Sequence, residues 1–367
     1  MKKVLLGACL VSTSFMLFGC GNMGKKATKP NPKTEYVYKG KGRGEEEICC
    51  DYNKETCSLN ESTKYVKIYD TNGNLLHDLT YSMHKGSYVL SLGLDYEYNE
   101  EGKLIREFLF NYNSYNDTST YSKSEYTYKG KEEIRMHYSL SDSGKWKTSY
   151  KVERTYDDNG NVLTEISSYA FGKKSKLELS DKRVYTYNSS NLLISEESYS
   201  ANNKKDGWES TPKVSHTYTY DSKNNLTKEE SNYSGYTDSI IGSEYQYDEN
   251  NNVIQAISYT GKGSNITIAS KKEYTYDSNN HKMLEIVSSY ENGEYTPYYK
   301  YESTYDSNGN ISSIVTSIYD KESAQLKIDR KTDYAYSIDK TTRTCYDYKS
   351  GVWELTVQYF LTYKTYE

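Results

Sequence analysis

A short motif, Tyr-Asp-x-Asn-Gly-Asn, recurs along this chain at positions 69–74, 156–161 and 305–310. Looser copies begin at Tyr98, Tyr128, Tyr187, Tyr220, Tyr247, Tyr276 and Tyr336. Successive copies start roughly 30 residues apart, and fixed periods of about 20 to 50 residues are typical of repeat architectures. This spacing predicts about ten copies of one supersecondary unit rather than one conventional compact domain.

Each copy has the sequence pattern of a β-hairpin. The run Glu273-Tyr274-Thr275-Tyr276-Asp277 alternates tyrosine with polar residues, which is typical of a half-buried strand. Asn, Asp and Gly then form a turn, and a second strand follows, as at 162–169. We expect an all-β fold of tandem two-stranded antiparallel hairpins, joined into an extended or curled β-meander or solenoid-like array. A flat sheet, a closed propeller and a hollow spiral all fit this pattern.

The composition predicts a thin sheet rather than a thick apolar core. Hydrophobic residues make up 35% of the 367 residues, and 44 of the residues are Tyr. Without Tyr and with Gly added, the apolar share is roughly 29%, against about 45–50% in ordinary globular domains. A tyrosine buries its ring while its hydroxyl stays hydrated, so cross-strand Tyr ladders can stabilise a sheet that is wet on both faces.

The N-terminus predicts export and lipidation. Residues 1–19 have a basic start, Lys2 and Lys3, and an apolar stretch of signal-peptide length. The stretch ends in Leu17-Phe18-Gly19-Cys20, which is similar to a bacterial lipobox with Cys20 as the lipid attachment site. Residues 20–34 would then be a tether. We expect an outer-membrane lipoprotein that faces the periplasm or the cell surface.

The remaining chain divides into a repeat array and two ends. We assign 65–336 to the array, 35–64 to an N-terminal cap and 337–367 to C-terminal cap strands, because open arrays need capped ends. Four cysteines could form disulfides in an exported chain, and they allow three pairings. They are Cys49, Cys50, Cys57 and Cys345.

The repeat turns place oxygen atoms as a calcium loop does, but incompletely. The turn residues are Asp70, Gly73, Asp157, Gly160, Asp306 and Gly309. In an EF-hand loop Gly stands at position 6 and Glu at position 12. Here Gly160 stands at position 4 and Ser168 at position 12, counted from Asp157. A hairpin turn stabilised by the Asp side chain explains the same residues without metal, so we expect no metal and no cofactor.

The sequence predicts no enzyme and no nucleic-acid partner. The five histidines are scattered over different repeats, and no serine lies in a nucleophile elbow. The net charge of −5 lacks the basic excess that nucleic-acid binding needs. One segment could instead form an aromatic ligand platform: Tyr295, Tyr298, Tyr299 and Tyr301. Tyrosine ladders packed within the sheet are the alternative explanation of this segment.

The repeat resembles the YD-repeat family, which is related to the rearrangement-hot-spot proteins. The stretches 154–162 and 303–311 carry the resemblance, which extends over about 65–336. The chain is also similar to short Tyr- and Asn-rich repeat lipoproteins of gut and oral Bacteroidota. The resemblance implies a β-repeat fold and an envelope location, and it transfers no catalytic residue.

Two functions fit these features. The first is a non-catalytic binding or adhesive scaffold of the envelope, with an unknown ligand. The second is a glycan- or peptidoglycan-binding module that uses exposed tyrosines. The sequence argues against an outer-membrane barrel, because segments such as Lys271-Lys272-Glu273 place charge on both faces of a strand and a lipid-facing surface must be apolar.

Overall fold

The computed structural model describes residues 42–53, 55–56, 58–113, 118–171, 176–202, 207–234, 239–262, 265–337 and 340–366. Every regular element is a strand: β1 (Gly42–Asn53), β2 (Ser58–Tyr69), β3 (Leu75–His84), β4 (Ser87–Tyr98), β5 (Leu104–Asn113), β6 (Thr118–Lys129), β7 (Glu132–Leu140), β8 (Trp146–Tyr156), β9 (Val162–Phe171), β10 (Lys176–Tyr187), β11 (Leu193–Asn202), β12 (Gly207–Trp208), β13 (Val214–Tyr220), β14 (Leu226–Tyr233), β15 (Ser239–Tyr247), β16 (Val253–Lys262), β17 (Asn265–Tyr276), β18 (Lys282–Glu291), β19 (Glu294–Tyr305), β20 (Ile311–Asp320), β21 (Gln325–Tyr336), β22 (Lys340–Lys349) and β23 (Val352–Tyr366). Among these described residues, no helix is long and apolar enough to cross a membrane.

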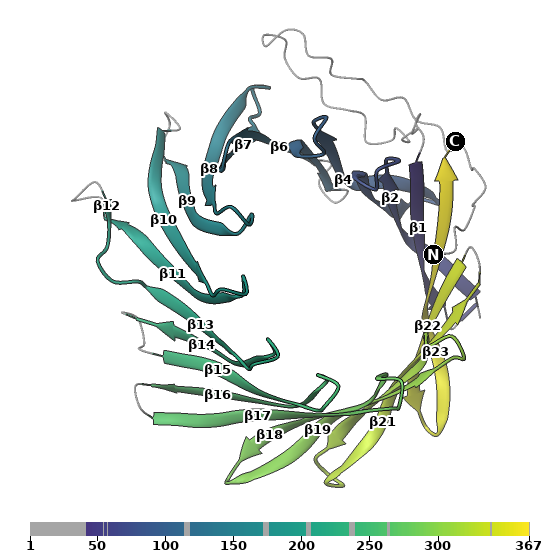
Figure 1. The fold of residues 1–367 in the computed structure, drawn as a ribbon. Helices are drawn as coiled ribbons and strands as arrows, with labels where there is room; N and C mark the ends of the chain where they lie inside the picture. The colour runs from purple at the N-terminus through teal and green to yellow at the C-terminus, as the bar shows by residue number, and fades with distance from the viewer. Residues whose placement is uncertain are drawn as a thin grey trace.

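The strands close into an antiparallel ring. Neighbours in sequence pair throughout, except that β11 pairs with β13 and the two-residue β12 pairs only with the end of β11. β1 pairs with β23 over ten residues, from Gly42 opposite Tyr366 to Asp51 opposite Val357. Of the 23 strands, all but β12 therefore form a closed barrel, and Figure 1 shows the first and last strands side by side.

The prediction of an extended or curled open array is therefore wrong. The segments predicted as caps, 35–64 and 337–367, contribute β1, β2, β22 and β23, and these strands form the seam of the barrel. The sequence argument against an outer-membrane barrel concerned charge on a lipid-facing surface and made no statement about closure. Closing the ring pairs the two edge strands that an open array would expose.

The recurring motif forms the turns at one end of the barrel, here named the motif rim. At Asp70, the backbone amide donates to the carbonyl of Asn74, and the amide of Gly73 donates to the carbonyl of Asp70, at 2.9 and 3.2 Å. Gly73 has φ of 88°, a conformation that favours glycine. Because alternate turns of an antiparallel meander lie at opposite ends, the other set of turns forms the far rim. β1 begins and β23 ends at the motif rim.

The tyrosine of the motif has a structural role that explains why it recurs. At eight hairpins the register shifts at this tyrosine, which is typical of a β-bulge. In seven copies the tyrosine hydroxyl donates to the first carbonyl of a strand in the preceding hairpin, for example Tyr98 to Leu75 at 2.9 Å and Tyr276 to Val253 at 2.9 Å. In the copies at Tyr69 and Tyr156 the hydroxyl donates instead to Glu45 and Glu133. The motif thus satisfies a carbonyl beside the bulge of its neighbour.

A second series of bulges lies within the strands. The extra residues are Ser62, Ser91, Ser149, Ser180, Ala269, Tyr298, Asp329 and Thr356. Several hydroxyls bond across the bulge, as Ser91 does to the carbonyl of Thr80 at 3.0 Å. Bulges bend the strand and increase its twist, and regularly spaced bulges promote the curvature that a barrel needs.

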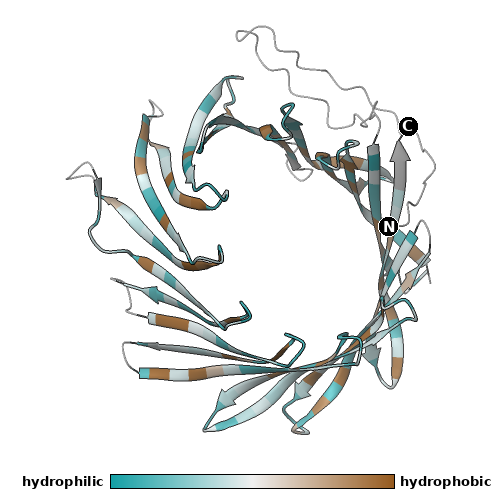
Figure 2. Ribbon diagram, in the orientation of Figure 1, coloured by the Kyte–Doolittle hydropathy of each residue, from teal (hydrophilic) through white to brown (hydrophobic). Residues whose placement is uncertain are grey.

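The barrel wall is a single layer with little buried core. The main apolar cluster of the described residues contains Leu79, Tyr81, Leu90, Phe110 and Tyr121. Around the rest of the ring, most side chains are half-buried. Figure 2 shows hydrophobic and hydrophilic residues mixed along the strands all around the ring. The prediction of a thin, tyrosine-rich sheet agrees with this packing.

Candidate functional site on the tyrosine face of the barrel

The register of the strands defines two faces of the wall. Residues directly opposite in an antiparallel pair point to the same face, so each pairing extends the assignment to the next strand. One face, here the Tyr face, carries Tyr126, Tyr156, Tyr185, Tyr245 and Tyr274. The other, here the Lys face, carries Lys123, Lys151, Lys271, Lys300 and Lys331.

Side-chain exposure does not separate the two faces. Carboxylates are more buried on the Tyr face, where the side chains of Glu133 and Glu285 are 11 and 17% exposed, than on the Lys face, where that of Glu302 is 48% exposed. The buried apolar cluster of Leu79, Tyr81, Leu90, Phe110 and Tyr121, however, lies on the Lys face. Both faces therefore combine buried and exposed groups.

The Tyr face carries an alternating network of charges and phenols. Arg135 contacts Glu107 at 3.2 Å. On the next strands, Arg154 lies between Glu133 and Glu165, at 3.0 and 2.7 Å. The hydroxyl of Tyr156 donates to Glu133 at 2.8 Å. The charges are therefore distributed in pairs along the wall rather than gathered at one point.

The same contacts change the acidity of the phenols. Burial, together with a hydrogen bond to Glu133, raises the pKa of Tyr156 to about 12. Burial and a hydrogen bond to Glu229 raise the pKa of Tyr245 to about 12 as well. Burial also lowers the pKa of His137, with Arg135 adding to the effect, so this imidazole is neutral at neutral pH. The Tyr face thus presents neutral phenols and imidazoles between ion pairs.

Two histidines of the Tyr face pair with serines of the neighbouring strand. Nδ1 of His137 lies 3.1 Å from the hydroxyl of Ser124, which also accepts a bond from Nε of Arg135. The His137 ring stacks on Tyr150 with 4.4 Å between centroids. His216 contacts Ser231 in the same cross-strand way, at 2.7 Å. The repetition of this pair at separate strands fits a packing role in the wall.

The predicted aromatic platform is divided between the two faces. Tyr299 and Tyr301 lie on the Tyr face and stack with centroids 6.0 Å apart, and Tyr298 approaches Tyr299 at 5.0 Å. Tyr295 lies on the Lys face beneath the ammonium group of Lys271, at 4.4 Å. Tyr295 and Tyr299 are four residues apart, so strict alternation along the strand would place both on one face. The bulge at Tyr298 reverses the alternation and moves Tyr295 to the opposite face.

The predicted turn residues occupy the motif rim. In each of the three perfect motifs, the Asp carboxylate accepts three hydrogen bonds. Two come from the backbone amides two and four residues ahead, and the third comes from the side-chain amide of the last Asn. For Asp157 these three bonds, to Asn159 and Asn161, measure 2.8, 2.8 and 2.9 Å. They hold the pKa of Asp157 below its usual value, the side chain of Asn161 contributing most. The same geometry occurs at Asp70 and Asp306, and Gly160 and Gly309 have positive φ.

Three of the candidate cysteines lie at the seam as free thiols: Cys49, Cys50 and Cys345. Cys49 pairs opposite Tyr359, and Cys345 lies two strands from Cys49 on the same face. A disulfide therefore does not join these three in the structure. Cys57, and the lipid attachment site Cys20, lie outside the described residues.

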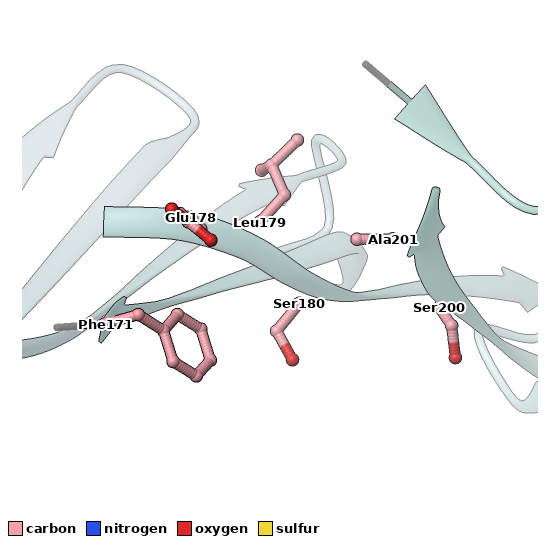
Figure 3. A pocket seen from close by; sticks show the side chains of 6 residues that line it. All are labelled: Phe171, Glu178, Leu179, Ser180, Ser200 and Ala201. Atoms are coloured by element: carbon pink, nitrogen blue, oxygen red, sulfur yellow. The ribbon is translucent and has the colours of Figure 1, made fainter. Parts of the chain in front are cut away.

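A shallow hollow of about 340 Å³ lies at the far-rim ends of β9, β10 and β11. Figure 3 shows Phe171, Ser180 and Ser200 on one side of the wall and Leu179 on the other. Phe171 is 56% exposed at its edge. Its lining mixes the apolar Phe171, Leu179 and Ala201 with the polar Glu178, Ser180 and Ser200.

Sequence reasoning missed a second recurrence, on the Lys face. A lysine two residues before an acid forms an ion pair at Lys123–Glu125, Lys151–Glu153, Lys271–Glu273, Lys300–Glu302 and Lys331–Asp333, with distances from 2.6 to 2.9 Å. The pattern Lys-x-Glu/Asp is visible in the sequence near the middle of alternate strands. A search for recurring pairs, besides the Tyr-Asp motif, could have found it.

Comparison with known proteins identified no matching family model and no matching curated protein. A porin-like protein from Bacteroides uniformis is 10% identical, with 88% of this chain and 97% of that chain covered and a TM-score of 0.30. A protein of unknown function from Bacteroides fragilis is 18% identical over 32% of this chain and 86% of that chain, with a TM-score of 0.27. A DUF3836 family protein from Bacteroides vulgatus is 19% identical over 24% of this chain and 96% of that chain, with a TM-score of 0.22.

Proteins this distant carry no argument about the fold or function of this chain. The ring closure described above rests on the strand pairings alone. The resemblance to the YD-repeat family stays a prediction.

Proposed function

We propose that this chain is a non-catalytic binding barrel of the bacterial envelope, held at the outer membrane by a lipid on Cys20, and that the Tyr face of its wall binds a hydrophilic glycan. The observation that carries the proposal is the closed ring of strands with one polar, tyrosine-rich face. The anchor rests on the sequence of residues 1–20.

The size of the ring supports a lumen that a ligand can enter. Barrels of about 16 to 18 strands already enclose an aqueous channel, whereas about eight strands give an interior that side chains fill. The present ring contains every one of the 23 strands except β12, which makes 23 − 1 = 22 strands. The described strands place only single-layer side chains on its inner surface, so these side chains alone leave the centre open.

The chemistry of the Tyr face favours a sugar ligand. Tyr299 and Tyr301 present stacked rings on this face, and Tyr299 is 39% exposed. Aromatic rings pack against the apolar faces of sugars, while nearby carboxylates and hydroxyls accept hydrogen bonds from sugar hydroxyls or donate to them. Glu285 lies directly opposite Tyr301 and supplies such an acceptor.

Calorimetric titration with soluble peptidoglycan fragments and envelope polysaccharides tests the glycan ligand. We expect Tyr299→Ala combined with Tyr301→Ala to weaken binding of the responding polysaccharide by at least tenfold, whereas Tyr295→Ala on the opposite face leaves it unchanged. Equal losses in both variants, or no binding by the parent protein, would contradict a glycan site on the Tyr face.

Protease accessibility on intact cells tests the location. Digestion of the barrel on intact cells would place it on the surface, and protection until the outer membrane is broken would place it in the periplasm. With Cys20→Ala we expect release from the membrane fraction upon loss of the lipid. A Cys20→Ala protein whose barrel is made in the same amount but stays membrane-bound through its N-terminus would contradict the lipid anchor.

The closed ring also favours a second candidate, a diffusion pore. Against it stand basic residues near mid-strand on both faces, Arg135 and Arg154 on the Tyr face and Lys151 on the Lys face, because a lysine or arginine at the bilayer midplane costs about 2–4 kcal/mol each whichever face meets lipid. Planar bilayer recordings of the purified protein distinguish the two. We expect no conductance steps, and stable steps would favour the pore.

A further inference from the structure

One row of the Tyr face connects the tyrosine platform of the proposed sugar site, Tyr299 and Tyr301, with an arginine. Tyr301 of β19 lies opposite Thr316 of β20, and Thr316 lies opposite Arg330 of β21. Figure 1 shows β19 and β21 close together at the bottom of the ring. Neighbouring strands lie about 4.8 Å apart, so the backbones of Tyr301 and Arg330 are about 10 Å from each other. In this row only the short side chain of Thr316 stands between the phenol and the guanidinium.

The guanidinium of Arg330 has only loose partners among the described residues. Its side chain is 60% exposed, and the two carboxylates beside it, those of Asp347 and Asp329, lie 3.8 and 3.9 Å away. An N–H···O hydrogen bond is about 2.7–3.2 Å long, so neither contact is a hydrogen bond. Lys349 lies closer to Asp347, at 3.2 Å, and offsets its charge. The donors of Arg330 are therefore available to a ligand.

Other arginines of the Tyr face lack this combination of a free guanidinium and a neighbouring phenol. Arg154 donates to Glu165 at 2.7 Å, and it would lose this bond before it could bind an external carboxylate. Arg183 is loosely paired, at 3.8 Å from Glu196. Its row continues into Glu165 on one side and Ser198 on the other, so no tyrosine lies beside it in that row.

The charges on the other side of the platform also favour an anionic ligand. Glu285 is the acid beside the platform there, and it contacts Lys282 at 2.7 Å, which offsets its charge. Lys272 lies on the same side and is exposed, and in its row only Val287 separates it from the platform. A ligand on the platform therefore lies between two exposed cations, Lys272 and Arg330.

We propose that the glycan of this site is acidic, with one uronic acid residue stacked on Tyr301 and its carboxylate bound by the guanidinium of Arg330. The inference rests on the glycan function proposed above and names the class of sugar. The planar guanidinium donates two parallel hydrogen bonds to a carboxylate, whereas a lysine acts as a point charge. The C6 carboxylate of a uronic acid extends beyond the edge of the sugar ring. One sugar residue can therefore stack on the phenol and reach the guanidinium across Thr316.

Pairs of ligands that share one backbone test the class of sugar. Calorimetric titration of the full chain compares oligomers of galacturonic acid and of glucuronic acid with their methyl esters, which lack the charge. We expect the parent protein to bind at least one acid about tenfold or more tightly than its ester, because hydrogen bonds between charged groups are the stronger ones. Arg330→Gln should bring this ratio below about threefold, and Arg330→Lys should restore only part of it, because an ammonium group cannot bind a carboxylate through a planar fork.

Arg183→Gln is the matched control for Arg330→Gln. Arg183 lies on the same face, its side chain is 51% exposed, and its ion pair is equally long at 3.8 Å. We expect this variant to keep the parent ratio between acid and ester. Salt gives a second readout that needs no variant: about 0.5 M salt should weaken binding of the acid by screening its charge, and it should leave binding of the ester unchanged.

Equal affinity for the acids and their esters would overturn the proposal, and so would an equal loss of the preference in Arg183→Gln. Dextran sulfate that binds as tightly as the uronic acid, with the same dependence on Arg330, would also overturn it, because the site would then select negative charge rather than a carboxylate. Binding of neutral polysaccharides without any preference for the acids would leave the glycan site of the Tyr face intact. No binding of any polysaccharide would remove both the acidic sugar and the proposed glycan function.

Discussion

At the scale of single residues, the repeat motif is a device for completing hydrogen bonds. Its Asp carboxylate accepts three bonds within its own turn, as at Asp157, and its Tyr hydroxyl bonds to a carbonyl in the neighbouring hairpin, as at Tyr276. Most copies therefore stabilise both themselves and the carbonyl of a neighbour, whereas Tyr69 and Tyr156 donate to glutamate side chains instead. This division explains why Tyr and Asp recur together, although a turn alone would need only Asp, Asn and Gly.

The phenol contribution can be measured at Tyr276, whose hydroxyl donates to the carbonyl of Val253 at 2.9 Å. We expect Tyr276→Phe to lower the free energy of unfolding by about 0.5–1.5 kcal/mol, because the carbonyl loses its partner beside the bulge. Tyr298→Phe, at an exposed position, is the control and should change it by less than about 0.5 kcal/mol. Denaturant titration measures the free energy of unfolding of both variants. Equal losses in the two variants would show that the hydrogen bond to the Val253 carbonyl does not account for the effect of Tyr276→Phe.

The turn carboxylates predict acid sensitivity. Hydrogen bonds from Asn161, Asn252 and Asn310 lower the pKa values of Asp157, Asp248 and Asp306 in the folded chain. A carboxyl with a lowered folded pKa adds stability above its unfolded pKa, near about 3.9, and this stability is lost as pH falls through the folded value. Stability should therefore fall on acidification below about pH 4.

Replacing those three carboxyl groups tests whether the turn carboxylates cause the acid sensitivity. We expect Asp157→Asn, Asp248→Asn and Asp306→Asn together to lower stability at pH 7 and to flatten its dependence on pH between about 5 and 2. Asp142→Asn, in an exposed turn at the far rim, is the control and should keep the parent slope. Unfolding free energies measured across this range decide the matter, and an unchanged slope in the triple variant would count against the turns.

At the scale of the strand, bulges decide which side chains share a face. Ser62, Ser91, Ser149, Ser180, Ala269, Tyr298, Asp329 and Thr356 each add one residue without a partner. A shift of one residue reverses the face of everything beyond it. The segregation of Tyr and Lys faces therefore depends on these insertions as much as on period-two alternation.

Deleting the bulge residue Ala269 tests whether this insertion serves only to bend the strand. Its neighbours Ile268 and Ser270 already lie opposite the adjacent residues Tyr259 and Ser258, so the deletion keeps the register and the face of Ile268. We expect the deletion to remove the local bend and to lower the free energy of unfolding by about 0.5–3 kcal/mol, whereas a loss of the β16–β17 pairing would contradict this role. Ala269→Ser keeps the bulge and should stay within about 0.5 kcal/mol of the parent. Thermal unfolding followed by circular dichroism would show whether the two variants differ.

At the scale of the whole molecule, the decisive contact is the seam between β1 and β23. It joins residues that are more than 300 positions apart in a chain of 367 residues. Arg343 contacts Glu47 at 3.6 Å and lies over the ring of Tyr359 at 3.8 Å, so charge and aromatic contacts reinforce the backbone pairing. Closure of so long a loop costs entropy that grows only slowly with length.

A designed disulfide tests closure directly. Glu47 lies opposite Leu361 across the seam, and opposite residues in antiparallel strands have the spacing that a disulfide needs. In a background with the native Cys49, Cys50, Cys57 and Cys345 changed to Ser, we expect Glu47→Cys with Leu361→Cys to form an intramolecular bond that shifts mobility on a non-reducing gel. An open array would give only intermolecular products.

A pair on distant parts of the ring is the control for this disulfide. Glu47→Cys with Glu229→Cys places the thiols on β1 and β14, which are not neighbours in the sheet. We expect no intramolecular bond from this pair under the same oxidation. Its formation would show that the unfolded chain, rather than the closed barrel, is being trapped.

The sequence by itself determined the local structure of this protein. Alternating Tyr and Thr, followed by Asp, Asn and Gly, has the period and the turn residues of a hairpin, and both are local properties. The small apolar share predicted a thin wall, and the motif predicted its own turn geometry. These features needed no knowledge of distant contacts.

Only the tertiary structure decided closure, face and site. Whether β1 meets β23 depends on twist and bulge angles summed around the ring, and no single repeat encodes that sum. The split of Tyr295 from Tyr299 depends on one unpaired residue, which period-two counting cannot detect. The two faces of the wall depend on the bulges and on closure of the sheet, so neither the Tyr face nor the seam could be predicted from the chain alone.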